Sequence, residues 1–396
     1  MATAEVQPVL PDELLEDIFL RLDDAADLAR ASAACTSFRR VVSSRRFLRR
    51  FRSPHTLPVL GFLEFIGVAG LHFHHAGPPH RSAMAARALA QAADFSFSFL
   101  PKDPLKSCRV CDARDGRVLL GRSTSGGWGF GDLVVCDPLY RRYVQIPLIT
   151  DDPVASALHS GQLEFESGWL EAFLAPPGED EEEDALSFQV ICNVLYEDKV
   201  VAFVFSSVTG EWLRVASFSF LPYGCIEDPE SLVRHNIRGC FYWRHHTWNN
   251  LLVLDTCEMK FSVVDPPPDS LNRQWAVADA GEDRLDLIAI DQCALDFYCK
   301  TLQNIGLGTD KWRHEKRISL PEINCNWSII GTAEGCFLLL ASPQDFFSFR
   351  PEMPKAQYFT LEIKTLLVER QCVARRFVYC ACLYASFPPP LSLPSI

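Results

Sequence analysis

The sequence contains no uninterrupted apolar stretch of 18 residues, so we expect no segment that spans a membrane. Its first residues, MATAEVQPVLPDELLED, show no basic region followed by an apolar core, so we expect no signal peptide. The 15 cysteines are scattered singly through hydrophobic runs. In a chain without a signal peptide, this pattern predicts reduced, buried thiols and a location in the cytoplasm, the nucleus or both.

The sequence also lacks common catalytic and metal-binding motifs. It has no Gly-x-Ser-x-Gly turn, no HExxH helix and no pair of carboxylates at a catalytic spacing. Cys108 and Cys111 form a CxxC without the second pair that zinc needs, and in a strand their side chains would point to opposite faces. The histidines within 72–75 and 245–246 stand beside turn residues and are typical of solvated loops. We therefore predict no enzyme activity, no metal site and no cofactor.

Charge is unevenly distributed along the 396 residues. The whole chain has a net charge of −12, yet residues 30–52 contain many arginines and no acidic residue. Because phosphate binding needs a basic surface, the acidic remainder argues against nucleic acid as the main ligand. The arginine run within 39–52 is either a nuclear-import signal or, as we prefer, a solvated helix face that steers toward an acidic partner.

The first 52 residues predict a small helical unit. Leu14, Ile18 and Leu22 recur with the spacing of one helix face, and Pro11 suits the first helical turn. Shorter helical patterns follow as far as Phe51. A unit this small has more apolar side chains than it can bury by itself, so the surplus is expected to serve a partner protein. The alternative is a helical cap on a larger domain.

The run from Leu10 to Leu48 resembles an F-box, the module through which cullin-RING ubiquitin ligases bind their adaptor. Two features depart from the usual pattern: Phe38, where many members carry Trp, and residues 23–26, where a Pro-rich turn is commoner. The resemblance implies that the matching residues bind a Skp-family adaptor and, through it, a cullin-RING complex. They are Leu10, Pro11, Leu14, Ile18, Leu22, Leu28, Ala31, Cys35, Phe38 and Val42.

Beyond residue 55, short apolar runs separated by turns predict an all-β domain. Groups of three or four strands recur at intervals of about 50 residues, which is typical of kelch-like propeller blades. A further unit is predicted between 57 and 117, with strands at 59–63 and 95–99 and a short helix or loop at 81–90. A strand within 377–384 is expected to share a blade with the N-terminal strands and close the ring. We predict six blades, with five or seven allowed; a β-sandwich is the alternative fold.

The predicted fold is therefore α+β and multidomain: a small N-terminal all-α F-box followed by an all-β propeller. The expected boundaries are 1–8 for a disordered N-terminus, 9–52 for the F-box, 53–388 for the propeller and 389–396 for a C-terminal tail. The runs 114–120 and 135–142 resemble the first-blade signature of the F-box-associated propeller proteins of plants, especially grasses.

These resemblances imply a substrate-recognition subunit of an SCF-type cullin-RING E3 ubiquitin ligase, in which the propeller binds an unknown target protein. The alternative is a propeller scaffold that binds the adaptor without causing degradation. Inter-strand loops are expected to carry target specificity. The candidates are Trp128 and Phe130 in a glycine-rich loop, and Arg244 with Trp248, because aromatic residues and Arg often anchor protein interfaces.

Overall fold

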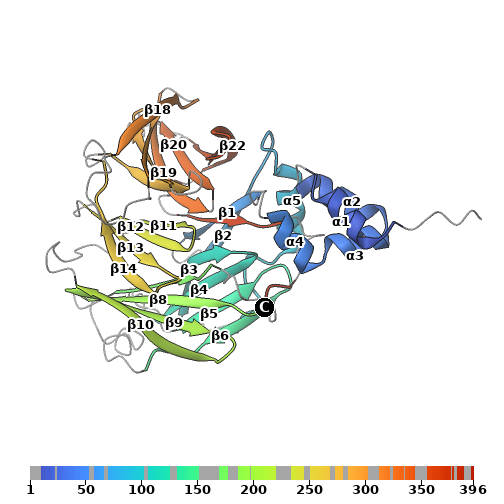
Figure 1. Cartoon of the computed structure of the whole chain (residues 1–396), viewed down its shortest axis with the longest axis horizontal. Coiled ribbons are helices and arrows are strands. Elements are labelled where there is room, and N and C mark those ends of the chain that lie inside the picture. Colours follow the sequence, from blue (N-terminus) through green and yellow to red (C-terminus); the bar gives the residue numbers. More distant parts are fainter. Residues whose placement is uncertain are drawn as a thin grey trace, which may run out of the picture.

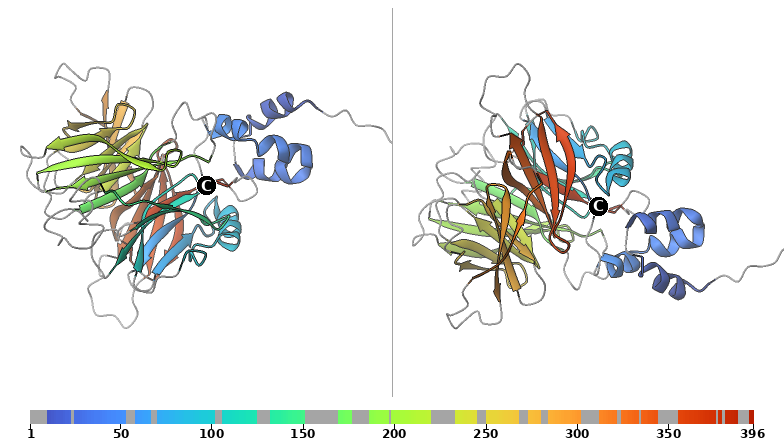
Figure 2. Two further views of the ribbon diagram at one scale, coloured as in Figure 1. Left: turned by 90° about the horizontal axis from the view of Figure 1, so that it is seen from below. Right: turned by 90° about the horizontal axis from the view of Figure 1, so that it is seen from above.

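In the computed structural model, the chain forms a small helical module beside a large β-structure (Figures 1 and 2). The structure describes residues 10–396, except for 23–24, 53–57, 67–69, 102–105, 125–131, 151–168, 177–185, 197, 220–232, 245–249, 268–272, 280–283, 302–311, 322–323, 334, 344–354, 376, 379–380 and 388–393. The predicted disordered segment 1–8 therefore lies outside the described residues. No helix in the described part is long and apolar enough to cross a membrane.

Four short helices make up the module: α1 (Asp12–Phe19), α2 (Ala25–Ala34), α3 (Thr36–Val42) and α4 (Arg45–Arg52). Pro11 precedes α1, and Asp12 and Glu13 lie in its first turn, where negative charge complements the helix dipole. Cys35 caps α3, since its Sγ accepts the Phe38 N–H at 3.4 Å. Aromatic rings fill the small core, with Phe19 and Phe38 edge to face at 5.2 Å.

Six antiparallel sheets, which we number as blades 1 to 6, make up the rest. Blade 1 has the order β2 (Gly70–His75), β1 (Val59–Ile66), β23 (Cys382–Ala385). Blade 2 holds β3 (Lys106–Arg114), β4 (Arg117–Thr124), β5 (Asp132–Asp137) and β6 (Arg142–Ile146); blade 3 holds β7 (Trp169–Leu174), β8 (Gln189–Leu195), β9 (Lys199–Ser206) and β10 (Glu211–Ser219). Blade 4 holds β11 (Val233–Ile237), β12 (Cys240–Arg244), β13 (Leu251–Asp255) and β14 (Lys260–Val264). Blade 5 holds β15 (Trp275–Asp279), β16 (Arg284–Asp291), β17 (Ala294–Thr301) and β18 (Arg313–Ser319); blade 6 holds β19 (Cys325–Ala333), β20 (Cys336–Pro343), β21 (Ala356–Glu362) and β22 (Leu367–Ala374).

The six blades form a closed ring. Each junction between neighbouring blades has its own buried apolar cluster, drawn from the facing sides of two sheets. The junction that closes the ring joins blades 6 and 1, where the rings of Tyr358 and Phe62 lie 4.9 Å apart. The prediction of a six-bladed propeller after a helical module is confirmed, and the five-bladed, seven-bladed and β-sandwich alternatives are wrong.

Blade 1 joins the two ends of the propeller, as predicted. β23 pairs antiparallel with β1, with Ala385 opposite Val59 and Leu383 opposite Phe62. Of the strand predicted within 377–384, the described residues form β23 from Cys382, while 379–380 lie outside the described residues. This pairing ties the C-terminal strand to the first one and so removes two free sheet edges.

The strand predicted at 95–99 is wrong. Its alternating Phe and Ser residues fit a strand pattern, but Asp94 accepts hydrogen bonds from the N–H and hydroxyl groups of Ser96 and Ser98, which bends the segment into turns. The helix-or-loop segment 81–90 is a helix, α5 (Ala83–Ala92). It packs Ala86 and Leu89 into the core between blades 1 and 2.

A repeated turn explains why several strands end in Asp. The Asp137 side chain accepts the N–H groups of Leu139 and Tyr140, and Asp255 does the same for Cys257 and Glu258. Both turns finish in the left-handed region, at Arg141 (φ 55°) and Met259 (φ 48°). The Asp side chain satisfies the N–H groups of the turn and so compensates for an unfavourable backbone conformation.

Charged side chains occupy the centre of the ring. Arg234 of β11 lies 2.7 Å from Glu171 of β7 and 3.5 Å from Asp112 of β3. The indole N–H of Trp243 also donates to Glu171 at 2.6 Å, and the Arg234 guanidinium stacks 4.5 Å from the Phe173 ring centroid. These groups link the inner strands of blades 2, 3 and 4 at the propeller axis.

His235, next to Arg234, predicts acid sensitivity. The imidazole is 1% exposed, and burial, together with the charges of Arg244 and Arg234, lowers its pKa to about 3. Because an unfolded His titrates near 6.5, protonation favours the unfolded chain throughout the window from about pH 6.5 down to about 3. We expect stability to fall as pH decreases through this window, by up to about 1.4 kcal/mol per pH unit from this residue. Urea unfolding at several pH values should show that the free energy of unfolding depends less steeply on pH in His235→Leu than in wild type. An equal dependence in the two proteins would show that His235 is not the source of the acid sensitivity.

Candidate functional site

An apolar stripe on α1 is the most exposed hydrophobic feature of the helical module. Leu14 and Ile18, one turn apart on α1, are 51% and 50% exposed, and Leu10, just before the N-cap Pro11, is 48% exposed. Leu15 and Phe19 point the other way and are buried in the module core. A single side chain exposed in this way is common, but three exposed apolar side chains spaced four residues apart are typical of a docking surface.

Ion pairs hold α1 against the following helices without covering the stripe. Arg40 of α3 lies 2.7 Å from Asp12, and Arg50 of α4 lies 2.8 Å from Glu16. Both side chains of the Arg40–Asp12 pair are exposed, so this pair contributes no more than about 1 kcal/mol. Part of the arginine run therefore pairs within the module, which the sequence pattern did not predict.

The other predicted adaptor-binding residues divide into three groups. Pro11 and Cys35 are exposed, and Leu22, Ala31 and Phe38 are half-buried against the module core. Leu28 and Val42 are fully buried. The structure thus corrects the expectation for these last two: they support the docking surface from inside and cannot touch a partner in this conformation.

The predicted target-binding residues lie mostly outside the described residues, namely Trp128, Phe130 and Trp248. Arg244 is described, at the end of β12. It donates to the Arg273 carbonyl at 2.8 Å, and its guanidinium lies 4.8 Å from the Trp275 ring centroid. Burial lowers its pKa. Arg244 is therefore engaged within the propeller, between blades 4 and 5, rather than projecting freely.

The topology places the ends of these candidate loops on one side of the ring. β23 runs toward the helical module, and the Tyr384 hydroxyl donates to the Gly116 carbonyl in the β3–β4 turn. That turn therefore lies on the side of the ring that faces the module, which we call the module face. Neighbouring strands in blades 2 to 6 are antiparallel and consecutive, so the opposite ends of their strands lie on the far face, away from the module in Figure 1. Thr124, Asp132, Arg244 and Leu251 stand at such strand ends.

Short and long connections occur on both faces of the ring. Tight turns on the module face include 115–116, 138–141, 207–210 and 238–239. Positive φ values at Asp115 and Gly116, and again at Arg238 and Gly239, fit two-residue hairpins. Long connections on the far face include 147–168, 220–232, 265–274 and 344–355, whereas the long connections 175–188 and 302–312 join strands on the module face. Long loops on a rigid scaffold are where binding specificity usually lies.

The cysteine and histidine groups do not form a metal centre in the described residues. Cys111 packs into the core between blades 2 and 3, whereas Cys108 lies near Cys136 on the other side of β3. The predicted opposite orientation of the CxxC side chains is confirmed. Burial raises the pKa of Cys111 to about 12, as expected for an unreactive thiol. The cysteines that the structure describes are all free of disulfide bonds.

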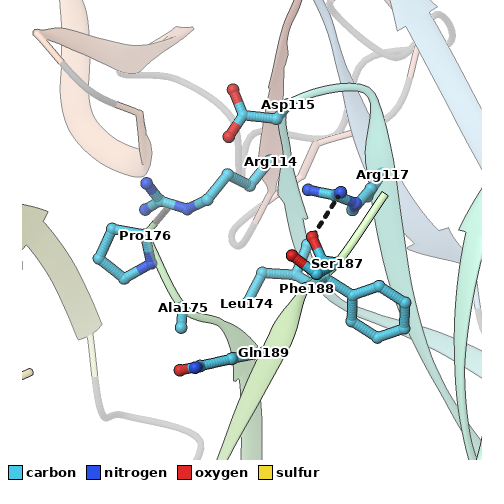
Figure 3. Close-up of a pocket in the computed structure, with 9 residues that line it drawn as sticks. All are labelled: Arg114, Asp115, Arg117, Leu174, Ala175, Pro176, Ser187, Phe188 and Gln189. Atoms are coloured by element: carbon cyan, nitrogen blue, oxygen red, sulfur yellow. Dashed lines mark hydrogen bonds between the residues drawn. The ribbon is translucent and has the colours of Figure 1, made fainter. Parts of the chain in front are cut away.

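A small pocket opens on the module face between blades 2 and 3 (Figure 3). Its lining includes Arg114, Asp115 and Arg117, opposite Pro176 and Ser187. Arg117 donates to the Ser187 carbonyl at 3.0 Å and to the Ser395 carbonyl at 2.8 Å. This arginine therefore joins the two blades to the last described residues of the chain.

Comparison with known proteins supports the assignment of the helical module. A model of the F-box-like family matches residues 8–53, and no curated protein matches the chain. Similar solved structures include a post-proline cleaving enzyme from Rickettsia typhi, at 9% identity and a TM-score of 0.37 over 93% of this chain and 58% of that one. A prolyl endopeptidase has 10% identity and a TM-score of 0.38, with 92% of this chain and 54% of that one covered. A duf4221-family member from Bacteroides vulgatus has 13% identity and a TM-score of 0.33, with 68% of this chain and 82% of that one covered.

The chain spans less than two thirds of the length of the first two of these structures. With TM-scores this low, the likenesses carry no argument about activity. The class that the fold and the site define is an F-box-like helical module followed by a six-bladed all-β propeller.

Proposed function

We propose that this chain is the substrate-recognition subunit of an SCF-type cullin-RING E3 ubiquitin ligase. The observation that carries the proposal is the exposed Leu10, Leu14 and Ile18 stripe on a module that matches the F-box-like family. Such a stripe buries apolar area when it meets the helices of a Skp-family adaptor, and each fully buried Leu or Ile contributes about 1.5–3 kcal/mol.

The propeller would hold the target on its far face. The stripe belongs to the module on one side of the ring, while the connections 125–131 and 245–250, which contain the candidate anchors, join strands on the other side. A target bound there would leave the adaptor surface free. Trp128, Phe130 and Trp248 belong to far-face connections and remain candidate anchors, with Arg244 holding the base of its loop.

Several finer assignments belong to the same proposal. The chain would catalyse nothing itself, because other subunits carry out ubiquitin transfer and this subunit supplies proximity and orientation. We infer a cytoplasmic or nuclear location and a protein target rather than nucleic acid. The motifs at 114–120 and 135–142 support a kelch-like propeller of the F-box-associated type found in plants, especially grasses.

The proposal is tested by comparing captured proteins. Full-length chain and its Ile18→Asp variant are used as baits in cells with and without a neddylation inhibitor. We expect adaptor and cullin with the wild-type bait only. A true target should be captured by both baits and should accumulate when neddylation is blocked. Targets that bind both baits but keep constant levels would favour the scaffold alternative.

A further inference from the structure

Phe387 comes from the C-terminal part of the chain but is buried in the N-terminal module. It follows β23 by two residues, and its side chain is 3% exposed. It belongs to the same apolar cluster as Phe47 and Phe51, and its ring centroid lies 6.1 Å from that of Phe51. A residue that leaves the propeller's closing strand thus completes the core of the helical module.

The residues around Phe387 are attached to the propeller. Ser386 donates its N–H to the Pro58 carbonyl at 3.3 Å, just before β1 begins. Further along, the Ser395 N–H and hydroxyl both donate to Asp137 at 2.8 Å. Ile396 packs against the core between blades 2 and 3. The described residues on either side of 388–393 are therefore fixed to blades 1 and 2.

In this arrangement Phe387 connects the core of the helical module to the closing strand of the propeller. Packed cores have few alternative arrangements, so a ring inserted among Phe47 and Phe51 resists rotation of the module about its connections. We propose that Phe387 is a positioning residue that holds the helical module in one fixed orientation relative to the propeller. Its consequence for ubiquitin transfer rests on the proposed function, because transfer depends on a defined geometry between adaptor and target.

The structural test measures a distance in the full-length chain. Spin labels are attached through non-cysteine handles at exposed positions 33 in α2 and 258 in the β13–β14 turn, and their distance distribution is recorded. We expect a narrow distribution for wild type, a broad one for Phe387→Ala and an intermediate one for Phe387→Leu, which keeps apolar bulk but loses the ring contact. Phe218→Ala, which removes a half-buried ring from β10, should leave the distribution unchanged.

Equal widths for wild type, Phe387→Leu and Phe387→Ala would overturn the proposal. If Phe387→Ala unfolds the module, as helical circular dichroism would reveal, the comparison of wild type with Phe387→Leu decides the question. An unchanged width in Phe387→Leu then overturns the proposal and a broadened one supports it.

A second measurement addresses the consequence for transfer. With purified adaptor and cullin-RING complex, we expect Phe387→Ala to retain adaptor binding, because the α1 stripe is unaltered. Ubiquitin attached to the propeller's own lysines should shift from a few positions to many, which mass spectrometry can map. An unchanged lysine pattern would contradict the consequence. If the wild-type chain does not bind the adaptor, the proposed function is refuted. The distance measurement would still decide the role of Phe387.

Discussion

Ile18→Asp is expected to abolish capture of a Skp-family adaptor while the propeller stays folded. Ile18 is 50% exposed at the C-terminal end of the stripe, so the substitution is tolerated by the free chain. In a complex it would place a charge in an apolar interface, at a cost of about 3 kcal/mol or more. Titration calorimetry with the purified adaptor should show affinity reduced by on the order of 100-fold.

Leu213→Asp is the matched control for this substitution. Leu213 is 64% exposed on the outer strand β10 of the propeller, so the same type of change is made away from the module. It should bind the adaptor as wild type does. Equal affinities for wild type, Ile18→Asp and Leu213→Asp would show that the α1 stripe is not the docking surface.

Arg234→Met is expected to cause the largest loss of stability in the propeller. The Arg234 side chain is 15% exposed and pairs with Glu171 and Asp112 across three inner strands. Removing one partner of a largely buried ion pair leaves the remaining charge without compensation, which costs about 3–5 kcal/mol. Chemical unfolding followed by tryptophan fluorescence should show a lower midpoint with the same slope.

The double variant Arg234→Met, Glu171→Gln tests the cause of that loss. Gln keeps an acceptor for the Trp243 N–H while removing one of the two charges that Arg234→Met leaves uncompensated, the other being Asp112. The double variant should recover part of the lost stability, whereas Glu171→Gln in the wild-type background should not stabilise the protein. If Arg234→Met alone leaves the unfolding midpoint unchanged, the ion pair is not a major source of stability.

Much of the propeller could be predicted from local sequence signals. Short apolar runs ending at Asp137 and Asp255 mark both a strand and the turn that follows, because the Asp side chain accepts the turn N–H groups. Repetition of this pattern at a regular interval indicates blades. Pairing of β1 with β23 followed from the need to close such a ring.

Other features depend on contacts that no local pattern reports. The segment 95–99 alternates like a strand, but its serines bind Asp94, so a local side-chain interaction outweighs the hydrophobic period. The burial of Phe387 has no signal in its neighbouring residues, since its partner Phe51 is at the other end of the chain. In the same way, Leu28 and Val42 match the F-box pattern, yet a sequence match cannot separate core positions from contact positions.

Reconstituted ubiquitin transfer tests the central claim most directly. Purified full-length chain is mixed with adaptor, cullin-RING complex, ubiquitin and a target captured by both wild type and Ile18→Asp. We predict ubiquitinated target with wild-type chain and none with Ile18→Asp, although both hold the target. If the wild-type chain binds adaptor and target together and the target remains unmodified, the chain is a scaffold rather than a ligase receptor.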